Sequence, residues 1–341
     1  MKAVAAVSAC LCWGVAHAQV SSGDEASSVQ MYGLIGMYVD HAKTSSAAQG
    51  TVQEGGGGLT TSYWGMRGQE DIGGGNKVVF RLESFFRPNT GQMGRNTTDG
   101  LFSRNAYVGL ANKAYGTVKF GLQTNETYVN QILLNPFGSS VVFSPLIVQS
   151  YVAGYNGTEL GDTVWDNAIG YFSPSIGGFS GAVQYSVSGV TGRQGRDNLG
   201  LHLNYRAGAL QIALSAQRVR AAATTPASSQ YLYLAGATYK ASFAKFYAAM
   251  QTTDNTTTQV GSHTYELGVS APVTAVSAVL AEWAFTKQSA PRSQDTTRST
   301  ASIGYDYDLS KRTDVYAVYS YDKLSAHPSG STYGVGIRHV F

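Results

Sequence analysis

Large apolar residues recur at every second position in many segments of the chain. Val29, Met31, Ile35, Met37 and Val39 share one face of an extended segment, and the same alternation runs through 78–86, 314–321 and 333–341. A period of two is typical of a β-strand with one apolar and one polar face. Beyond the first residues, no stretch of 18 uninterrupted apolar residues predicts a membrane helix. The pattern therefore predicts an all-β protein.

The alternating segments predict sixteen strands with a regular rhythm of connections. Short turns such as 71–76, 206–209 and 308–313 alternate along the chain with longer loops rich in Gly, Ser, Thr and Asn. This alternation puts the turns at one rim of a sheet and the loops at the other. The predicted strands are 29–39, 60–70, 77–87, 102–110, 116–124, 164–173, 178–188, 197–206, 209–220, 229–240, 243–252, 262–271, 275–286, 297–308, 313–323 and 331–341.

The solvent decides how such a sheet is completed. In hydrocarbon an unpaired strand edge leaves backbone N–H and C=O groups unsatisfied, so a spanning sheet must close on itself. Strands of about ten residues, even in number, are the bacterial outer-membrane solution. The polar faces then line a lumen, and a barrel of sixteen strands encloses water. The prediction is a 16-stranded antiparallel transmembrane β-barrel through which solutes pass.

Composition agrees with this class. Charged residues make up only 13% of the chain, whereas Gly (40) and Tyr (22) are abundant and the formal net charge is +3. No basic block suggests a nucleic-acid partner.

The first eighteen residues predict a cleaved signal peptide. Lys2 precedes an apolar run, and Ala16-His17-Ala18 is a small-x-small cleavage site, so the mature barrel domain would be 19–341. Both cysteines, Cys10 and Cys12, fall within this leader. A lipoprotein cleavage box ending at Cys10 is the less favoured alternative, because its apolar run is short.

Several motifs, taken in order, resemble the trimeric porins of β-proteobacteria. The resemblance spans the mature chain, and it implies a homotrimer that passes small hydrophilic solutes by passive diffusion through the outer membrane, in contact with its lipid and lipopolysaccharide. The matching segments are YWGMRGQEDIGGG at 63–75, VFRLE at 79–83, RNAYVGL at 104–110, YGTVKFG at 115–121, DNAI at 166–169, YFSP at 171–174, GGF at 177–179 and YDYDLSKRT at 305–313.

One connection, residues 125–163, is far longer than the others, and a loop of about forty residues is usually functional. In the family resembled here, the third external loop folds into the barrel and narrows it. The resemblance assigns that role to 125–163, with Asn135, Pro136, Phe137 and Gly138 at its tip. A surface loop or a lid that contacts a partner is the alternative.

Selectivity in such pores depends on charge at the narrowest point. The resemblance and strand parity place Arg81, Glu83 and Arg104 on the wall, with Tyr63 where the family usually carries another arginine. Asn135 stands where an aspartate is common. A constriction poor in charge predicts weak ion selectivity, with anion preference left open. The nearest loop acids are Glu126, Glu159 and Asp162.

The final strand predicts an assembly signal. Tyr333, Val335, Ile337 and Phe341 alternate up to a terminal aromatic residue. This ending resembles the signal by which outer-membrane barrels are passed to their assembly machinery; an ordinary amphipathic strand is the alternative.

The sequence predicts no enzyme, metal site or cofactor, since its histidines are scattered and no H-E-x-x-H motif occurs. The alternative to a general diffusion porin is the same barrel used as a substrate-preferring channel or a surface receptor. In that case, Tyr63 and Phe137 would select a ligand.

Overall fold

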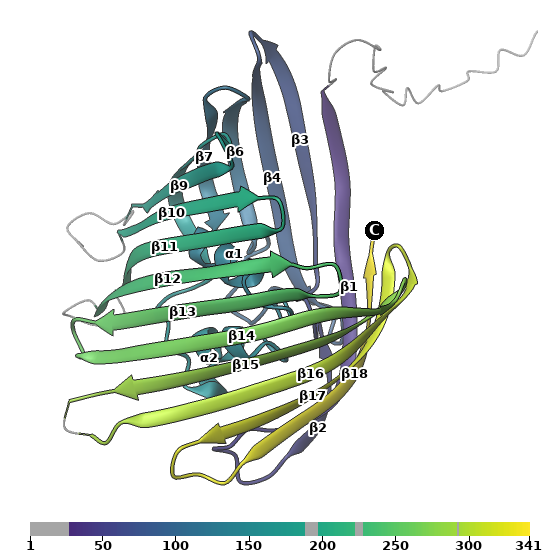
Figure 1. Ribbon diagram of the computed structural model, residues 1–341. Helices are drawn as coiled ribbons and strands as arrows, with labels where there is room; N and C mark the ends of the chain where they lie inside the picture. The colour runs from purple at the N-terminus through teal and green to yellow at the C-terminus, as the bar shows by residue number, and fades with distance from the viewer. Residues whose placement is uncertain (1–26, 188–196, 222–227, 292) are drawn as a thin grey trace, which may run out of the picture.

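The computed structural model describes residues 27–187, 197–221, 228–291 and 293–341. The leader predicted at 1–18 lies outside these residues. Sixteen long strands form one closed antiparallel barrel (Figure 1), as predicted. They are β1 (Ser28–Lys43), β3 (Tyr63–Gly73), β4 (Asn76–Arg87), β6 (Asn105–Asn112), β7 (Gly116–Thr124), β8 (Val164–Phe172), β9 (Phe179–Ser186), β10 (Asn198–Ala207), β11 (Leu210–Ala221), β12 (Ser228–Lys240), β13 (Lys245–Asn255), β14 (Val260–Thr274), β15 (Ser277–Ser289), β16 (Thr296–Ser310), β17 (Thr313–Leu324) and β18 (Gly330–Val340).

Two shorter strands belong to the long loops. The strand β2 (Thr51–Gly56) pairs with the distal half of β1, directly beyond the place where β3 pairs with its first half. The strand β5 (Gln92–Met93) pairs with the end of β4. The sequence predicts only loop at 51–56, because Val52 is the single large apolar residue there and no alternation marks a strand.

The barrel closes between its first and last strands. Leu34 to Lys43 pair with Ser331 to Val340 in an unbroken antiparallel ladder. Phe341 continues this pairing, since its carbonyl accepts from the Gly33 N–H at 3.2 Å and its own N–H donates to the Gly33 carbonyl at 3.1 Å. The terminal residue is thus part of the closing seam.

The connections fall into two sets. Short turns, together with the start of β1 and the end of β18, lie at one rim, which we call the turn rim; the longer loops lie at the other, the loop rim. In bacterial outer-membrane barrels the short turns face the periplasm. The third long loop runs from Asn125 to Thr163 and contains α1 (Glu126–Leu133), α2 (Pro145–Tyr151) and the 3₁₀-helix η1 (Ala153–Tyr155). None of these helices was predicted.

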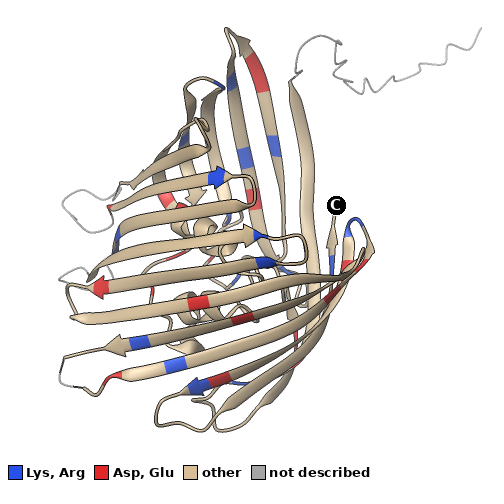
Figure 2. Ribbon diagram, viewed as in Figure 1, with Lys and Arg blue, Asp and Glu red and all other residues tan. Residues whose placement is uncertain are grey.

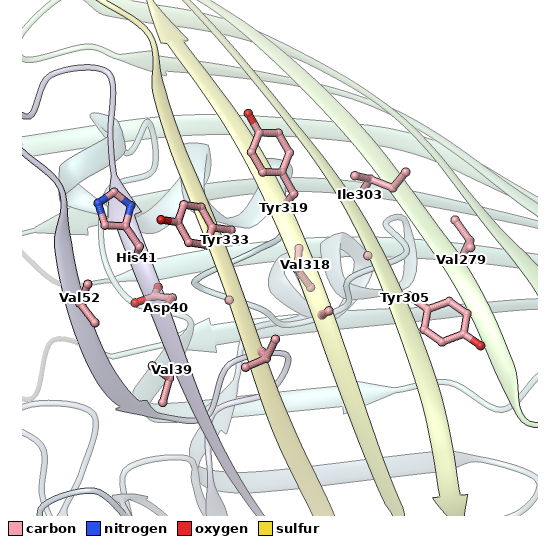
Figure 3. A pocket seen from close by; sticks show the side chains of 14 residues that line it. Val39, Asp40, His41, Val52, Val279, Ile303, Tyr305, Val318, Tyr319 and Tyr333 are labelled. Carbon is pink, nitrogen blue, oxygen red and sulfur yellow. The ribbon is translucent and has the colours of Figure 1, made fainter.

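The two faces of the wall differ in chemistry. Outward positions along β18 are apolar and exposed, such as Tyr333, Val335 and Ile337, whereas inward positions carry Thr332 and Arg338. Figure 3 shows one outward groove over β1, β2 and β15–β18, where Val39, Val52, Ile303, Tyr305, Tyr319 and Tyr333 gather. This apolar outer surface suits contact with hydrocarbon. Within the described residues, the helices are all too short or too polar to cross a membrane.

Candidate pore constriction

The third loop begins with a helix whose start is encoded locally. The side chain of Asn125 caps α1, because its Oδ1 accepts from the N–H groups of Thr127 (2.7 Å) and Tyr128 (3.3 Å). Glu126 follows in the first turn, where the negative charge of a carboxylate interacts favourably with the helix dipole. The N–H of Asn125 also donates to the Thr163 carbonyl at 2.9 Å, which brings the two ends of the loop together.

The second helix is attached to the barrel wall. Ser144 caps α2 and Pro145 occupies its first turn, a favoured combination. Glu282 of β15, on the inward face, accepts from Ser144 Oγ (3.0 Å) and from the Leu146 N–H (2.8 Å). Gln149 donates to the Ala284 carbonyl at 3.1 Å and to Thr300 Oγ1 at 2.8 Å. These bonds fix α2 against β15 and β16 inside the barrel (Figure 1).

Four inward glycines receive apolar side chains of the loop. A β-carbon at Gly236 would lie 2.6 Å from Leu134 Cδ1, and one at Gly268 would lie 2.6 Å from Pro136 Cδ. At Gly304 the β-carbon would lie 3.0 Å from Phe137 Cε1, and at Gly334 it would lie 3.0 Å from Phe143 Cζ. We call these four positions the glycine seat. The close contacts show that the loop is packed onto the inner wall rather than spread over the loop rim.

The predicted tip residues take part in this packing. Phe137 is 3% exposed and belongs to a buried cluster with Leu59, Phe143, Tyr316 and Val318. Asn135 donates to the carbonyls of Gln131 and Gly138, both at 2.9 Å. Gly138 has φ of 59°, a conformation that favours glycine. The tip is therefore turned toward β14–β18.

With the loop on that side, the opening lies against the opposite wall. A cavity of about 310 Å³ is bounded by inward residues of β4, β6, β7 and β8 and by α1. Its charged lining residues are Arg81, Arg104 and Lys119 on the wall side and Glu126 on the loop. We call this cavity, with these four residues, the constriction.

The wall carboxylate behind the constriction is neutralised. Glu83 is fully buried, and its Oε2 accepts from Arg104 Nη1 and from Asn105 Nδ2, both at 2.5 Å. Arg81 Nη1 lies 3.8 Å from Glu83 Oε1, and Tyr32 donates its hydroxyl to the same oxygen. Glu83 therefore orients the two arginines, and its charge offsets one of theirs.

Each cation of the constriction also lies over an aromatic ring. Arg104 Cζ is 4.1 Å from the centre of the Tyr63 ring, and Arg81 Cζ is 6.0 Å from that of Tyr107. Lys119 Nζ is 3.8 Å from the centre of the Phe172 ring. Contacts of this kind stabilise a cation and restrict its orientation.

The structure separates the predicted acids. Glu126 lines the constriction, whereas Asp162 is not among its lining residues and accepts from Arg95 Nη1 of the second loop at 2.6 Å. Glu159 is packed behind the loop, where it accepts hydrogen bonds from Gln131 and, at 3.0 Å, from Gln251. Burial raises the pKa of Glu126 above its usual range, and nearby Lys119 opposes that change.

Sequence reasoning missed Lys119, Tyr107, Tyr128 and Phe172 as lining residues. Strand alternation could have identified Lys119. Its neighbour Phe120 is an outward apolar residue, so Lys119 points inward.

Glu159 is expected to make the loop sensitive to pH. Burial without a cation raises its pKa to about 7, although hydrogen bonds from Tyr151 and Gln131 act in the opposite direction. A carboxyl group with a raised pKa holds its proton in the folded state, so its attachment is strongest below about pH 4.5 and weakens as pH rises through about 7. Channel current should fluctuate more at pH 8 than at pH 5, and Glu159→Gln should remove most of the difference.

Recordings of the parent and of Glu159→Gln at both pH values test this assignment. Equal pH sensitivity in the parent and in Glu159→Gln would contradict the assignment of Glu159 as the titrating group.

The part of the chain that the structure describes contains no cluster of three or more His, Cys, Asp and Glu residues suited to a metal ion. The described lining of the constriction combines charged, hydroxyl, amide and aromatic side chains.

Comparison with known proteins is consistent with this geometry. The family model of Gram-negative porins matches residues 3–327. An outer membrane porin of Bordetella pertussis is 32% identical over 331 residues, which covers 82% of each chain. Outer membrane porin protein 32 of Delftia acidovorans is 27% identical, with 92% of this chain and 88% of that one covered.

Solved structures agree. The anion-selective porin from Comamonas acidovorans superimposes with a TM-score of 0.78 at 26% identity, covering 92% of this chain and all of that one. The OmpT barrel of Vibrio cholerae, at 14% identity and a TM-score of 0.71, shares the fold. The chain belongs to the Gram-negative porin family and forms a passive diffusion channel of the bacterial outer membrane.

Proposed function

We propose that this porin prefers anions and that the constriction sets the preference. The observation that carries the proposal is the charge at the opening, where Arg81, Arg104 and Lys119 face a single loop carboxylate, Glu126. Buried Glu83 pairs with Arg104 and offsets one of these cations, so three cations stand against two carboxylates and a net charge of +1 remains. In a narrow passage with low-dielectric walls, such an excess concentrates anions and repels cations. The similar porin from Comamonas acidovorans is described as anion-selective.

A reversal potential measured across a KCl gradient in a planar bilayer tests the proposal. The expected potential lies on the chloride side of zero at low ionic strength and moves toward zero at high salt, because salt screens the wall charges. Acidification should increase the preference, since Glu126 has a raised pKa and loses its charge before an ordinary glutamate would. A potential on the potassium side of zero would refute anion preference.

The other predicted constriction residues receive supporting roles in this proposal. Tyr63 positions Arg104, and Asn135, Pro136, Phe137 and Gly138 hold the loop on the wall. Glu159 and Asp162 anchor the later part of the loop to β13 and to Arg95. Since Phe137 is buried in the loop–wall cluster, it does not offer its ring to solutes, which favours general diffusion over ligand selection.

We also propose how the mature channel is reached. Residues 1–18 are removed as a leader, and the alternating residues Tyr333, Val335, Ile337 and Phe341 direct residues 19–341 to the barrel assembly machinery. The role of Phe341 is supported by its position in the closing seam. The assembled form is a homotrimer surrounded by outer-membrane lipid and lipopolysaccharide, and it has no catalytic residues. One OmpT structure of the same fold is described as a trimer.

A further inference from the structure

Three basic residues gather at the turn rim, on a part of the wall that does not border the constriction. Arg206 lies at the end of β10, Lys240 at the end of β12 and Lys245 at the start of β13. In Figure 2, blue segments mark the ends of β10 and β12 and the start of β13, with β11 between β10 and β12. Lys240 and Lys245 stand directly opposite each other in the β12–β13 ladder. Arg206 faces Gln211 of β11, which in turn faces Thr238 of β12.

The register directs these side chains toward the lumen. Lys240 and Lys245 share a face with Thr238, which is 3% exposed, and with Tyr247. The alternate positions, Tyr239 and Phe246, are exposed apolar residues of the outer surface. The basic residues therefore border the water of the inner mouth and not the lipid.

A cavity of about 470 Å³ lies among them. Besides the three cations, its lining includes the polar side chains of Gln211, Thr238 and Ser270, and it includes no Asp or Glu. Arg206 Nη2 donates to Gln211 Oε1 at 3.3 Å, and Lys245 Nζ lies 4.5 Å from the centre of the Tyr247 ring. Neither contact neutralises a charge.

Two other inward arginines of the barrel are paired with carboxylates. Arg298 is paired with Asp322 at 2.7 Å, and Arg338 is paired with Asp314 at 3.0 Å. Among the described residues, no carboxylate comes within 4.0 Å of Arg206, Lys240 or Lys245. Like charges directly opposite on neighbouring strands destabilise a sheet. The cluster is thus an unfavourable arrangement for the empty barrel, and a negatively charged ligand would relieve it.

We propose that Arg206, Lys240 and Lys245 form a binding site for small multivalent anions at the periplasmic mouth, separate from the constriction. Three cations from three strands, with amide and hydroxyl groups beside them, match a solute that carries two or three carboxylate or phosphate groups. A monovalent anion compensates only one of the three positive charges. Hydrogen bonds to charged groups are stronger than those between neutral groups, and each of the three residues can supply one. We therefore expect the loss of any of the three to weaken binding.

Single-channel recording with citrate tests the proposal. With KCl fixed at low ionic strength, citrate added to one side should reduce the current at lower concentration than citrate added to the other, while acetate at equal ionic strength should have little effect. In Lys240→Gln/Lys245→Gln, the half-blocking concentration on the sensitive side should rise about tenfold or more. Arg206→Gln alone should raise it by a smaller factor.

A matched control removes two charges from the same rim. Lys311→Gln/Arg312→Gln lies in the exposed β16–β17 turn and should leave the half-blocking concentration unchanged. Unchanged block in Lys240→Gln/Lys245→Gln, or an equal loss of block in the control, would overturn the site. Block by acetate as strong as block by citrate would show only a general electrostatic field and would also overturn it.

Calorimetric titration of the detergent-solubilised porin with citrate gives a readout that does not depend on conduction. Saturable heat that disappears in Lys240→Gln/Lys245→Gln is expected, and its absence from the parent protein would refute the site. Failure of the anion preference proposed for the constriction would leave this result intact, so the two proposals can fail separately. Barrel folding of each variant is checked by heat-dependent mobility on a gel.

Discussion

Replacement of Arg104 by glutamine is expected to lower the anion-to-cation permeability ratio roughly two- to fivefold, the factor that about 0.5–1 kcal/mol of Coulomb energy produces. The substitution removes one of three cations from the constriction. Because Arg104 is the partner that offsets buried Glu83, two cations then stand against two carboxylates, and the net charge falls from +1 to zero. The loss of the net positive charge favours cations. Reversal potentials at about 0.1 M salt, where screening is incomplete, provide the measurement.

Two further variants make the Arg104 experiment specific. Lys287→Gln removes the same charge from an exposed residue on the outer face of β15, where Lys287 pairs with Asp295, and should leave the reversal potential unchanged. Arg104→Lys keeps the charge and should retain most of the selectivity. If Arg104→Gln shifted the potential no more than Lys287→Gln, Arg104 would have no part in selection.

The second large effect is expected from the glycine seat. In Gly268→Leu, the new side chain would occupy the space of Pro136, since even a β-carbon there would lie 2.6 Å from Pro136 Cδ. Overpacking of this kind costs about 1–3 kcal/mol, enough to displace the loop tip for much of the time. The channel should then show higher conductance or several current levels, because the loop no longer narrows the lumen steadily.

The control lies on the same strand. Gly261 of β14 faces outward, and a β-carbon there would come no closer than 3.6 Å to Thr253 O. Gly261→Leu should therefore retain the parent conductance. In addition, Pro136→Gly should restore steady current to the milder variant Gly268→Ala, because it removes the ring that clashes, while Glu266 Oε1, 2.7 Å away, is the end of a flexible side chain that can move aside. Parent-like current in Gly268→Leu would show that the glycine seat does not hold the loop.

The barrel strands could be predicted well because lipid and water impose a simple rule on each residue. The segment predicted at 77–87 is β4 (Asn76–Arg87), and parity correctly turned Arg81 and Glu83 inward. Boundaries at the loop rim were less accurate, as β1 continues to Lys43. There the wall leaves the hydrocarbon, and the strict alternation that marks a strand is no longer required.

The inside of the third loop could be predicted only in part. Local capping signals were present, with Asn125 before α1 and Ser144-Pro145 before α2, but the helices are short and depend on contacts with β11 and β15. Which loop acids reach the opening is decided by the path of the loop. That path follows from Gly236, Gly268, Gly304 and Gly334, residues far away in sequence, so Glu126 and Glu159 could not be told apart beforehand.

The way in which the third loop joins the wall has a practical consequence. Thr124 faces Val164 in the β7–β8 ladder, and Asn125 is bonded to Thr163, so the loop leaves and re-enters the wall at one point. Everything between these residues is an insert that the ladder does not need for its own pairing. A shorter turn, or a segment that gives the pore another width and chemistry, can therefore replace the loop at that junction. This makes the barrel a candidate scaffold for engineered sensing pores.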